Sequence, residues 1–505
     1  MSFLPIVQRE LRVSSRRKST YYARGAAAML GIVISLFLLL MLSFGGSSQS
    51  GAYVFAVLSW YALLTTLLAG VFLASDSLSE ERREGTLGLL FLTDLKGYDV
   101  VLGKFMAVSL NAFYGLLAVF PVLALCLLAG GVSGVEFWRT CLALLNLLFF
   151  SVTAGTLVSS SSSSSYRAMT GSIALLVIWL LVTKLASATR LYYMSNLSPF
   201  EPFLMASDAN YFRLAREFWI SLAISHLTGW IFLGWASWRL KSFVDKGKTS
   251  GVWQRVFTRN LFRGSAVRRA RLLEINPVLW LLDDSRRLRW VAWLLSLGAV
   301  AVLVFIWSKA GPAVFYFSSY AMWPFYFLLK VFVAIQACRF FGEARRTGAL
   351  ELLCCTPLTM REVVRGQWML LRRVFLWPLV VLLLAHLSCL IFGALQGGGI
   401  FSAATGTMPG PFGYLFLYRE YSVIPNNLAD FFAIGWFGMW LALSMQRPNM
   451  ATGLTILSVV ILPAIVFCVP TLATDAIFIT IGWVKLSEDF RLRQAQWVAP
   501  KPAAS

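Results

Sequence analysis

Six long blocks of apolar residues contain no charged side chain, and each is at least 19 residues long. At a rise of about 1.5 Å per residue, a helix of that length spans roughly 28 Å, close to the hydrocarbon thickness of a bilayer. Charged residues make up only 13% of the 505 residues, about half the share usual in soluble domains. The composition excludes a disordered chain and argues strongly against an ordinary soluble enzyme, and an all-α polytopic membrane protein is predicted. The blocks are Ala26 to Phe44, Ala52 to Ser75, Phe105 to Val135, Thr140 to Tyr166, Phe218 to Trp238 and Trp290 to Ser308.

Weaker apolar stretches raise the expected number of transmembrane helices to about twelve. The last of them contains Asp475 and Lys485, so hydropathy alone supports eleven spans about as well as twelve. These further spans are expected near 168–186, 313–338, 374–392, 427–445, 451–469 and 471–486.

The formal net charge of +21 follows the predicted topology. Six Lys and Arg residues precede the first span, and basic flanks resist translocation, which places the amino terminus inside. With alternating spans, most of the 44 Lys and Arg fall on the inner side. The basicity therefore indicates orientation and contact with anionic membrane lipid, and no nucleic-acid partner is expected.

An internal repeat organises the chain. Residues 80–104 align without a gap to residues 343–367, and 12 of these 25 positions are identical. Six predicted spans separate the two copies, so both should face the same side and the duplication should be parallel. It also favours the twelfth span, because a six-span first half predicts a six-span second half.

The repeat predicts five segments. We expect a cytoplasmic interfacial segment, a first six-span half, a basic cytoplasmic linker, a second six-span half and a cytoplasmic tail. Their expected bounds are 1–25, 26–238, 239–289, 290–486 and 487–505.

We call residues 80–104 and 343–367 the two elbows. In each, charged residues at the exit of a span precede an apolar helical face, and the helix should break at Asp94 or Pro357. Thr359 and Glu362 have the spacing of a capping box for a new helix, which Lys96 and Asp99 imitate poorly. Such a helix, turn and helix fits the docking of another protein, and a loop resting on lipid headgroups is the alternative.

The candidate docking residues are mainly the charged, glycine, leucine and threonine positions that the two elbows share. They are Glu80, Arg82, Arg83, Gly85, Leu87, Leu90 and Thr93 in the first elbow, and Glu343, Arg345, Arg346, Gly348, Leu350, Leu353, Thr356 and Pro357 in the second.

The pattern E-R-x-x-G-x-L-x-L-L-x-x-T-x-L, which ends at Leu95 and is echoed by T-P-L at residues 356–358, resembles the cytoplasmic coupling element of type-2 ATP-binding-cassette (ABC) exporter permeases. The resemblance is specific over the elbows and extends in layout to both halves. It implies a non-catalytic subunit of a bacterial cytoplasmic membrane whose elbows, the coupling helices of that family, receive a pair of separate ATPases. ATP and Mg would bind to those ATPases, and Asp94 departs from the proline of the second copy.

No catalytic, cofactor-binding or metal site is expected in the chain itself. A phosphate-binding loop needs a glycine-rich turn followed by Lys and Ser or Thr. The match at Gly247-Lys248-Thr249 lacks the leading glycine, because Ser242 stands there, and it follows a membrane helix. The seven cysteines show no metal-ligand spacing.

A few polar residues within the spans remain as candidates. Lys330 lies near the middle of the eighth span, where a lysine should face protein or water, and Asp475 lies in the weak last span. His226 and His386 favour hydrogen-bonded structural roles over proton relay.

Two polar segments complete the picture. The serine run 159–165 predicts a short flexible link. The outer segment 393–430 should be largely irregular, because it is rich in glycine and proline.

An ion-coupled secondary transporter is the alternative function, since that class also builds twelve spans from two parallel halves. The long elbows and the scarcity of charge in the spans favour the permease. The substrate is not predicted by the sequence.

Overall fold

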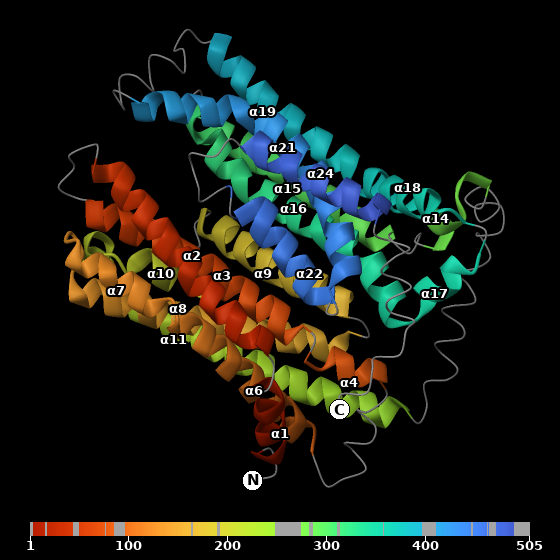
Figure 1. Ribbon diagram of the computed structural model, residues 1–505. Helices are drawn as coiled ribbons and strands as arrows, with labels where there is room; N and C mark the ends of the chain where they lie inside the picture. Colours follow the sequence, from red (N-terminus) through yellow and green to blue (C-terminus); the bar gives the residue numbers. More distant parts are fainter. Residues whose placement is uncertain are drawn as a thin grey trace. The chain divides into compact units, whose positions relative to one another are not determined.

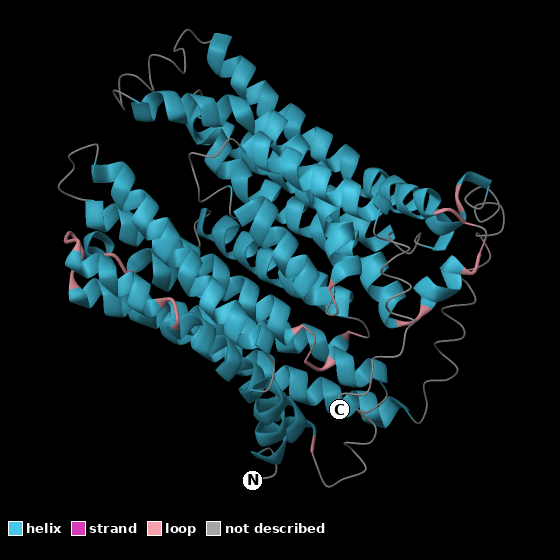
Figure 2. Cartoon of the chain, viewed as in Figure 1, coloured by secondary structure: helices cyan, strands magenta, loops and turns pink. Residues whose placement is uncertain are grey.

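All elements of the structure are helical. The computed structural model describes residues 4–15, 18–43, 50–75, 77–84, 96–162, 165–188, 192–247, 274–281, 286–310, 314–356, 358–395, 411–445, 448–461, 463 and 471–488. None of these residues forms a strand (Figure 2).

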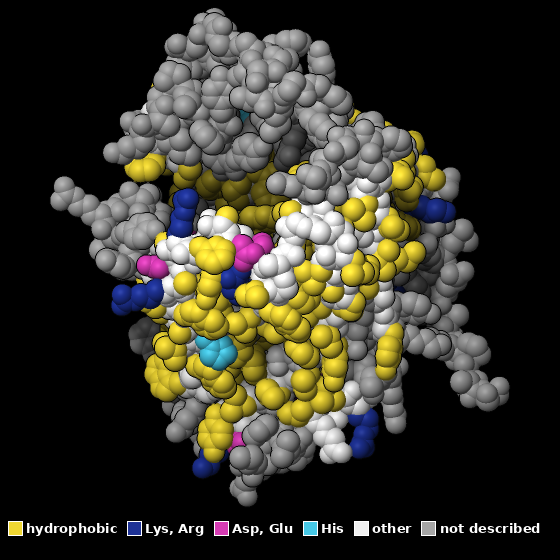
Figure 3. All heavy atoms as spheres, turned by 90° about the vertical axis from the view of Figure 1, so that its left-hand side faces the viewer, with side chains coloured by type: hydrophobic (Ala, Val, Ile, Leu, Met, Phe, Trp, Pro, Cys, Tyr) yellow, Lys and Arg dark blue, Asp and Glu magenta, His cyan; other side chains and the backbone are white. Residues whose placement is uncertain are grey.

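Seven helices in these ranges are long and apolar enough to cross a membrane, which agrees with the predicted helical membrane class. On the face seen in Figure 3, hydrophobic side chains cover most of the described surface. Leu36, Ile231 and Leu294 are each more than 60% exposed, as expected of side chains that contact lipid. The total of twelve spans stays a prediction. The seven helices are 51–74, 97–128, 134–161, 208–240, 288–305, 322–345 and 361–391, and shorter apolar helices cover 28–40, 166–180 and 450–461.

The chain divides into two compact units, unit 1 (residues 1–256) and unit 2 (residues 257–505). The division falls within the basic segment 239–289. The finer segment bounds stay predictions.

Unit 1 is built around α8, which packs against α3 and α11 (Figure 1). Small residues let α3 and α8 approach closely: a Cβ placed on Gly70 would lie 2.0 Å from Ser151 Oγ, and one on Gly155 would lie 2.7 Å from Ala74 Cβ. The elements are α1 (Leu4–Ser15), α2 (Lys18–Ser43), α3 (Ser50–Ala74), α4 (Ser79–Glu84), α6 (Gly97–Leu117), α7 (Phe120–Leu128), α8 (Gly134–Ser161), α9 (Ser165–Ala188), η1 (Tyr192–Leu197), α10 (Glu201–Met205) and α11 (Asp208–Gly247).

Unit 2 is built in the same way around α21, which packs against α16 and α24. A Cβ on Gly438 would lie 3.4 Å from both Ala337 Cβ and Cys338 Sγ. The elements are α14 (Pro277–Leu281), α15 (Arg286–Ala310), α16 (Val314–Arg346), α17 (Ala349–Cys354), α18 (Met360–Leu371), η3 (Arg372–Leu376), α19 (Trp377–Leu395), α21 (Pro411–Ser444), α22 (Pro448–Thr455), η4 (Ile456–Ile461) and α24 (Thr471–Glu488).

The serine run is not a flexible link over most of its described length. Helix α8 continues to Ser161, and α9 begins at Ser165. Ser159 is fully buried: its Oγ accepts the backbone N–H groups of Leu78 (3.1 Å) and Ser79 (3.0 Å) and donates to the carbonyl of Ser75 (2.8 Å). The prediction was wrong because the Ser159 hydroxyl finds backbone partners on the neighbouring segment, and the hydroxyls of Ser160 and Ser161 donate to the Leu157 carbonyl of their own helix.

The outer segment 393–430 is also more regular than predicted. Helix α21 begins at Pro411, and Pro425 lies inside it. Residues 396–410, with their three consecutive glycines, lie outside the described residues.

Candidate functional site

The second elbow includes the last turn of α16, which ends at Arg346. Gly348 follows with a left-handed backbone (φ 72°) and precedes the first residue of α17. Side chains with a Cβ rarely adopt this conformation, which explains a glycine at the bend. The chain therefore leaves the membrane helix in a new direction.

The turn that follows α17 ends in the predicted capping box. The Thr359 backbone N–H donates to Glu362 Oε2 (2.7 Å), and the Glu362 backbone N–H donates to Thr359 Oγ1 (3.4 Å). This confirms the start of α18. Helix α18 continues through η3 into α19, so the second arm of this elbow is continuous with the predicted ninth span (374–392) in one long apolar helix, 361–391.

The surface of this elbow differs from the apolar face predicted by sequence spacing. Leu350 is only 3% exposed, whereas Leu352 is 71% exposed and Leu353 is half-buried. Leu352 is therefore the leucine of α17 that a partner could contact in this conformation. In sequence it lies between Glu351 and Leu353. The exposed charged or polar side chains of the elbow include Glu351, Thr356, Thr359, Arg361, Glu362 and Arg365.

Two shared arginines hold helix ends. Arg345 Nη1 donates to the carbonyls of Leu443 (3.1 Å) and Met445 (2.7 Å), at the carboxyl end of α21. In unit 1, Arg82 Nη1 donates to the carbonyl of Ser160 (3.4 Å), near the end of α8. A cation at a helix carboxyl end is favourable because it complements the helix dipole. Burial is the main cause that lowers the pKa of Arg82 from its ordinary value.

Other predicted docking residues can be described only in part. Glu343 pairs with Arg339 one turn earlier on α16 (3.5 Å). Gly85, Leu87, Leu90, Thr93 and Pro357 lie outside the described residues, and so do the side chains of Glu80, Arg83 and Arg346.

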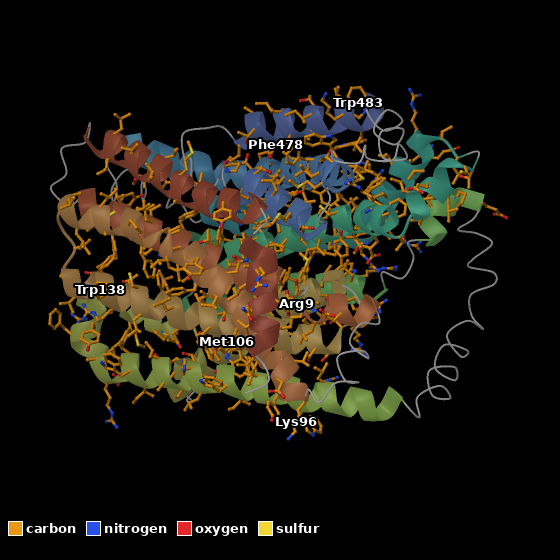
Figure 4. All side chains as sticks on the ribbon, turned by 60° about the horizontal axis from the view of Figure 1, so that its bottom comes forward. Arg9, Lys96, Met106, Trp138, Phe478 and Trp483 are labelled. Atoms are coloured by element: carbon orange, nitrogen blue, oxygen red, sulfur yellow. The ribbon has the colours of Figure 1, made fainter. Side chains whose placement is uncertain are left out.

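The described ends of the first elbow join the amino-terminal helix α1 through an ion network. Lys104 Nζ of α6 lies 2.9 Å from Glu10 Oε1 of α1 and 2.8 Å from Glu81 Oε1 of α4. Arg9, labelled in Figure 4, lies 2.7 Å from Glu10 and 3.4 Å from Glu81. Burial raises the pKa of Glu10, but hydrogen bonds from Arg9 and Lys104 outweigh it and leave that pKa below its ordinary value. Sequence analysis missed this network, because only contact between α1 and α6 brings the charges together.

In unit 2, the short helix α14 packs against α18, the second arm of the second elbow. Asn276 Nδ2 donates to the Glu362 carbonyl (2.9 Å), and a Cβ on Gly366 would lie 2.8 Å from Asn276 Oδ1. Gly366 is one of the positions shared by the elbows. Gln367, which replaces Lys104, donates through Nε2 to the Gln336 carbonyl of α16 (2.8 Å).

A second group of functional candidates lies between the long helices of unit 2. Lys330 of α16 forms an ion pair with Asp430 of α21, and Asp475 of α24 experiences the charges of both. The sequence singles out Lys330 and Asp475. Asp430 is not singled out, because it falls at the end of the outer segment 393–430 as well as inside the span expected near 427–445; in the structure it lies inside α21.

The two histidines differ in their surroundings. His226 Nδ1 lies 3.2 Å from Asn146 Oδ1, and the Trp230 indole donates to His226 Nε2 (3.2 Å), as its predicted structural role requires. His386 is fully buried beside the ring of Tyr326, and its ring nitrogens have no hydrogen-bond partner within the described part of the chain.

Among the residues that the structure describes, no group of three or more His, Cys, Asp or Glu could hold a metal ion. No protein-family model matches this sequence, and no curated protein matches it. The elbow and the buried charges are therefore the features from which a function can be argued.

Proposed function

We propose that this chain is the non-catalytic membrane subunit of an ABC transporter, of the type-2 exporter permease class that its elbows resemble. Separate ATPases dock on elbows 80–104 and 343–367 from the cytoplasm and bind ATP and Mg. The chain lies in a bacterial cytoplasmic membrane with its amino terminus inside.

The observation that carries this proposal is the form of the second elbow. A short helix, α17, interrupts the path from α16 to α18 and presents Leu352 at 71% exposure next to Glu351, and α18 exposes the charged side chains of Arg361, Glu362 and Arg365. An apolar contact with a charged surround is what a protein partner needs for affinity and register. Both arms are attached to other elements of unit 2, because Arg345 donates to the carbonyl of Leu443 and the Glu362 carbonyl accepts from Asn276.

Matching contacts within the two units support the duplication. Arg82 reaches Ser160, and Arg345 reaches Leu443. Similarly, Gly155 approaches Ala74, and Gly438 approaches Ala337. The two contacts follow the same pair of sequence shifts. The arginines and the alanines of unit 2 lie 263 positions after those of unit 1, and the residues that they contact lie 283 positions after their counterparts. Two equivalent elbows on one side suit a two-fold symmetric pair of ATPases.

Affinity purification from native membranes tests this function. The wild-type chain should bring down an ABC ATPase encoded in an adjacent reading frame. Leu352→Asp should lose most of it, because the exposed apolar contact becomes charged, whereas the matched control Leu352→Met should retain it. The proposal fails if no ABC ATPase copurifies with the wild type, or if Leu352→Asp is correctly inserted and binds it fully.

An ion-coupled secondary transporter is the second candidate, and the buried charges of Lys330, Asp430 and Asp475 favour it. Coupling to an ion needs titratable groups inside the bundle. Charged residues are scarce in the predicted spans, but these three lie together inside unit 2. Proteoliposomes discriminate between the two functions. Substrate movement driven by an ion gradient without ATPase supports the transporter, and strict dependence on the ATPase supports the permease.

A further inference from the structure

Three charged residues meet inside unit 2, one from each of its three main packed helices. The ion pair joins Lys330 of α16 to Asp430 of α21, whose side chains are 20% and 8% exposed. Asp475 of α24 is fully buried and lies within electrostatic reach of both. Fully ionised, the cluster carries one uncompensated negative charge.

Asp475 has unsatisfied hydrogen-bonding capacity. No described donor reaches either of its carboxylate oxygens, and the neighbouring Asp430 carboxylate, which lies within hydrogen-bonding reach, can only accept when it is ionised. A buried carboxylate without a donor or a full counter-charge is strongly disfavoured, so it takes up a positive charge or a proton. This unpartnered side chain is the observation that points to a ligand.

The polar atoms nearby along these helices are also acceptors in need of a donor. Buried oxygens of Asn426, Asn427 and Thr471 have no hydrogen-bond partner among the residues described. The two asparagines lie about one turn before Asp430 on α21, and Thr471 lies one turn before Asp475 on α24. In the predicted topology, α21 and α24 both begin on the outer side. These polar residues therefore lie on the outer side of the charged cluster.

The corresponding positions of unit 1 are all apolar. The 263-position shift relates Lys330 to Leu67, and the 283-position shift relates Asp430 to Leu147. For α24, two glycines give the alignment. Gly482 approaches Trp436 and Gly229 approaches Thr153, which are related by the 283-position shift, so Gly482 corresponds to Gly229. The same alignment of α24 with α11 relates Asp475 to Leu222. The three charges thus occur as a set in one unit, while three leucines fill the same places in the other.

This comparison separates the cluster from the requirements of folding. A bundle of the same design folds with leucine at all three positions, so the charges are not needed to hold such helices together. Replacing buried ion clusters with apolar residues of similar size is often neutral or stabilising. The charges in unit 2 therefore need another explanation.

We infer that Asp475 is a proton-binding site, in which its carboxylate takes up one proton from the outer side while Lys330 remains paired with Asp430. The step is a simple protonation: one O–H bond forms on Asp475, and the cluster becomes neutral. The inference rests on unit 2 alone and holds whether or not an ATPase docks on the elbows.

A proton fits this site better than a metal ion. The Lys330 ammonium group repels a second cation, and no metal-binding group of acidic, His or Cys side chains occurs in the described ranges. The charged groups that face Asp475 are Asp430 and Lys330, from the helices packed around it. The described residues of η4, which also contacts α24, are apolar or Ser458. On α19, His386 faces Tyr326 of α16, and Lys485 is exposed near the other end of α24.

Infrared spectroscopy of the purified full-length chain tests the inference. At neutral pH, the wild type should show the band of a protonated carboxyl group that shifts in heavy water. Asp475→Asn should lose this band, and the matched control Asp208→Asn, at a partly exposed aspartate paired with Arg139, should retain it. A band that persists in Asp475→Asn, the absence of any such band, or its removal by sodium but not by choline at constant pH would each overturn the inference.

A second set of variants separates proton binding from structural support. The triple variant Lys330→Leu, Asp430→Leu and Asp475→Leu recreates the unit 1 pattern and should fold with an unfolding temperature no lower than wild type, without the carboxyl band. Lys330→Leu alone should lower that temperature, because it leaves two buried carboxylates without a counter-charge. A triple variant that cannot fold would show that the cluster serves folding and would refute the inference.

Discussion

At the scale of single residues, Gly348 sets the direction of the second elbow. Its left-handed backbone is strained for any residue with a Cβ, and no other atom crowds the position. Gly348→Ala should therefore lower the free energy of unfolding by about 1 kcal/mol through backbone strain alone. Thermal or denaturant unfolding in detergent measures this loss.

The matched control is Gly453→Ala in α22. This glycine is helical and also has open space around its Cβ position. Alanine is the better helix former, so this substitution should be neutral or stabilising. Equal destabilisation by the two substitutions would argue against strain at Gly348.

Glu10 should make the packing of α1 against α6 sensitive to acid. Its folded-state pKa is lower than its ordinary value, so its ion pairs stabilise the contact between α1 and α6 above that ordinary pKa. The contribution disappears as the pH falls through the lowered pKa and Glu10 becomes protonated. Spin labels on α1 and α6 should move apart on acidification, and Glu10→Gln should show the longer distance already at neutral pH. If the distance between the labels on α1 and α6 is the same after acidification and in Glu10→Gln as in the wild type at neutral pH, Glu10 does not have this role.

Sequence patterns located some of these residues and misjudged others. Lys330 was identifiable because a lysine inside an apolar span is costly. Asp430 was not singled out, although the span expected near 427–445 contains it, because the polar residues before it place it at the predicted boundary of that span. The spacing of Leu350 and Leu353 correctly indicates one helical face, but periodicity does not say whether that face points to the core or to solvent. Burial of Leu350 answers that question, and Leu352 becomes the exposed leucine.

At the scale of elements, Ser159 joins the end of α8 to the segment between α3 and α4. Ser159→Ala would leave the backbone N–H groups of Leu78 and Ser79 without this acceptor inside a buried site. Each such group costs about 1–3 kcal/mol, so unfolding measurements should show a loss of at least about 2 kcal/mol. Ser161→Ala, at an exposed position on the same helix, should cost less than about 0.5 kcal/mol. Similar losses of unfolding free energy in Ser159→Ala and Ser161→Ala would contradict a special role for the Ser159 hydroxyl.

The elbow helices show where local sequence is sufficient. Pro357 and the Thr359–Glu362 spacing predict a helix break and a restart from short-range rules, and α17 and α18 follow that prediction. The serine run 159–165 has the same composition as a linker. Its helical structure depends on partners about 80 residues away, which local rules do not include.

At the scale of the whole molecule, each unit has one central helix, α8 or α21, held on both sides by long helices. In each unit, an elbow arginine donates hydrogen bonds to backbone carbonyls at the carboxyl end of that central helix. A force applied to the elbow would therefore reach the helix that organises the bundle. Composition predicts the helical membrane class, with which the structure agrees, and the repeat of residues 80–104 predicts a duplication. The contacts between the elbow arginines and the central helices appear only in three dimensions.

The most direct test of this account is the sidedness of the two elbows. In a chain without other cysteines, Lys96→Cys and Thr359→Cys occupy equivalent exposed positions, 263 residues apart. A membrane-impermeant thiol reagent should label both in inside-out vesicles and neither in intact cells. Labelling of the two positions from opposite sides would contradict the parallel duplication and the paired docking of an ATPase.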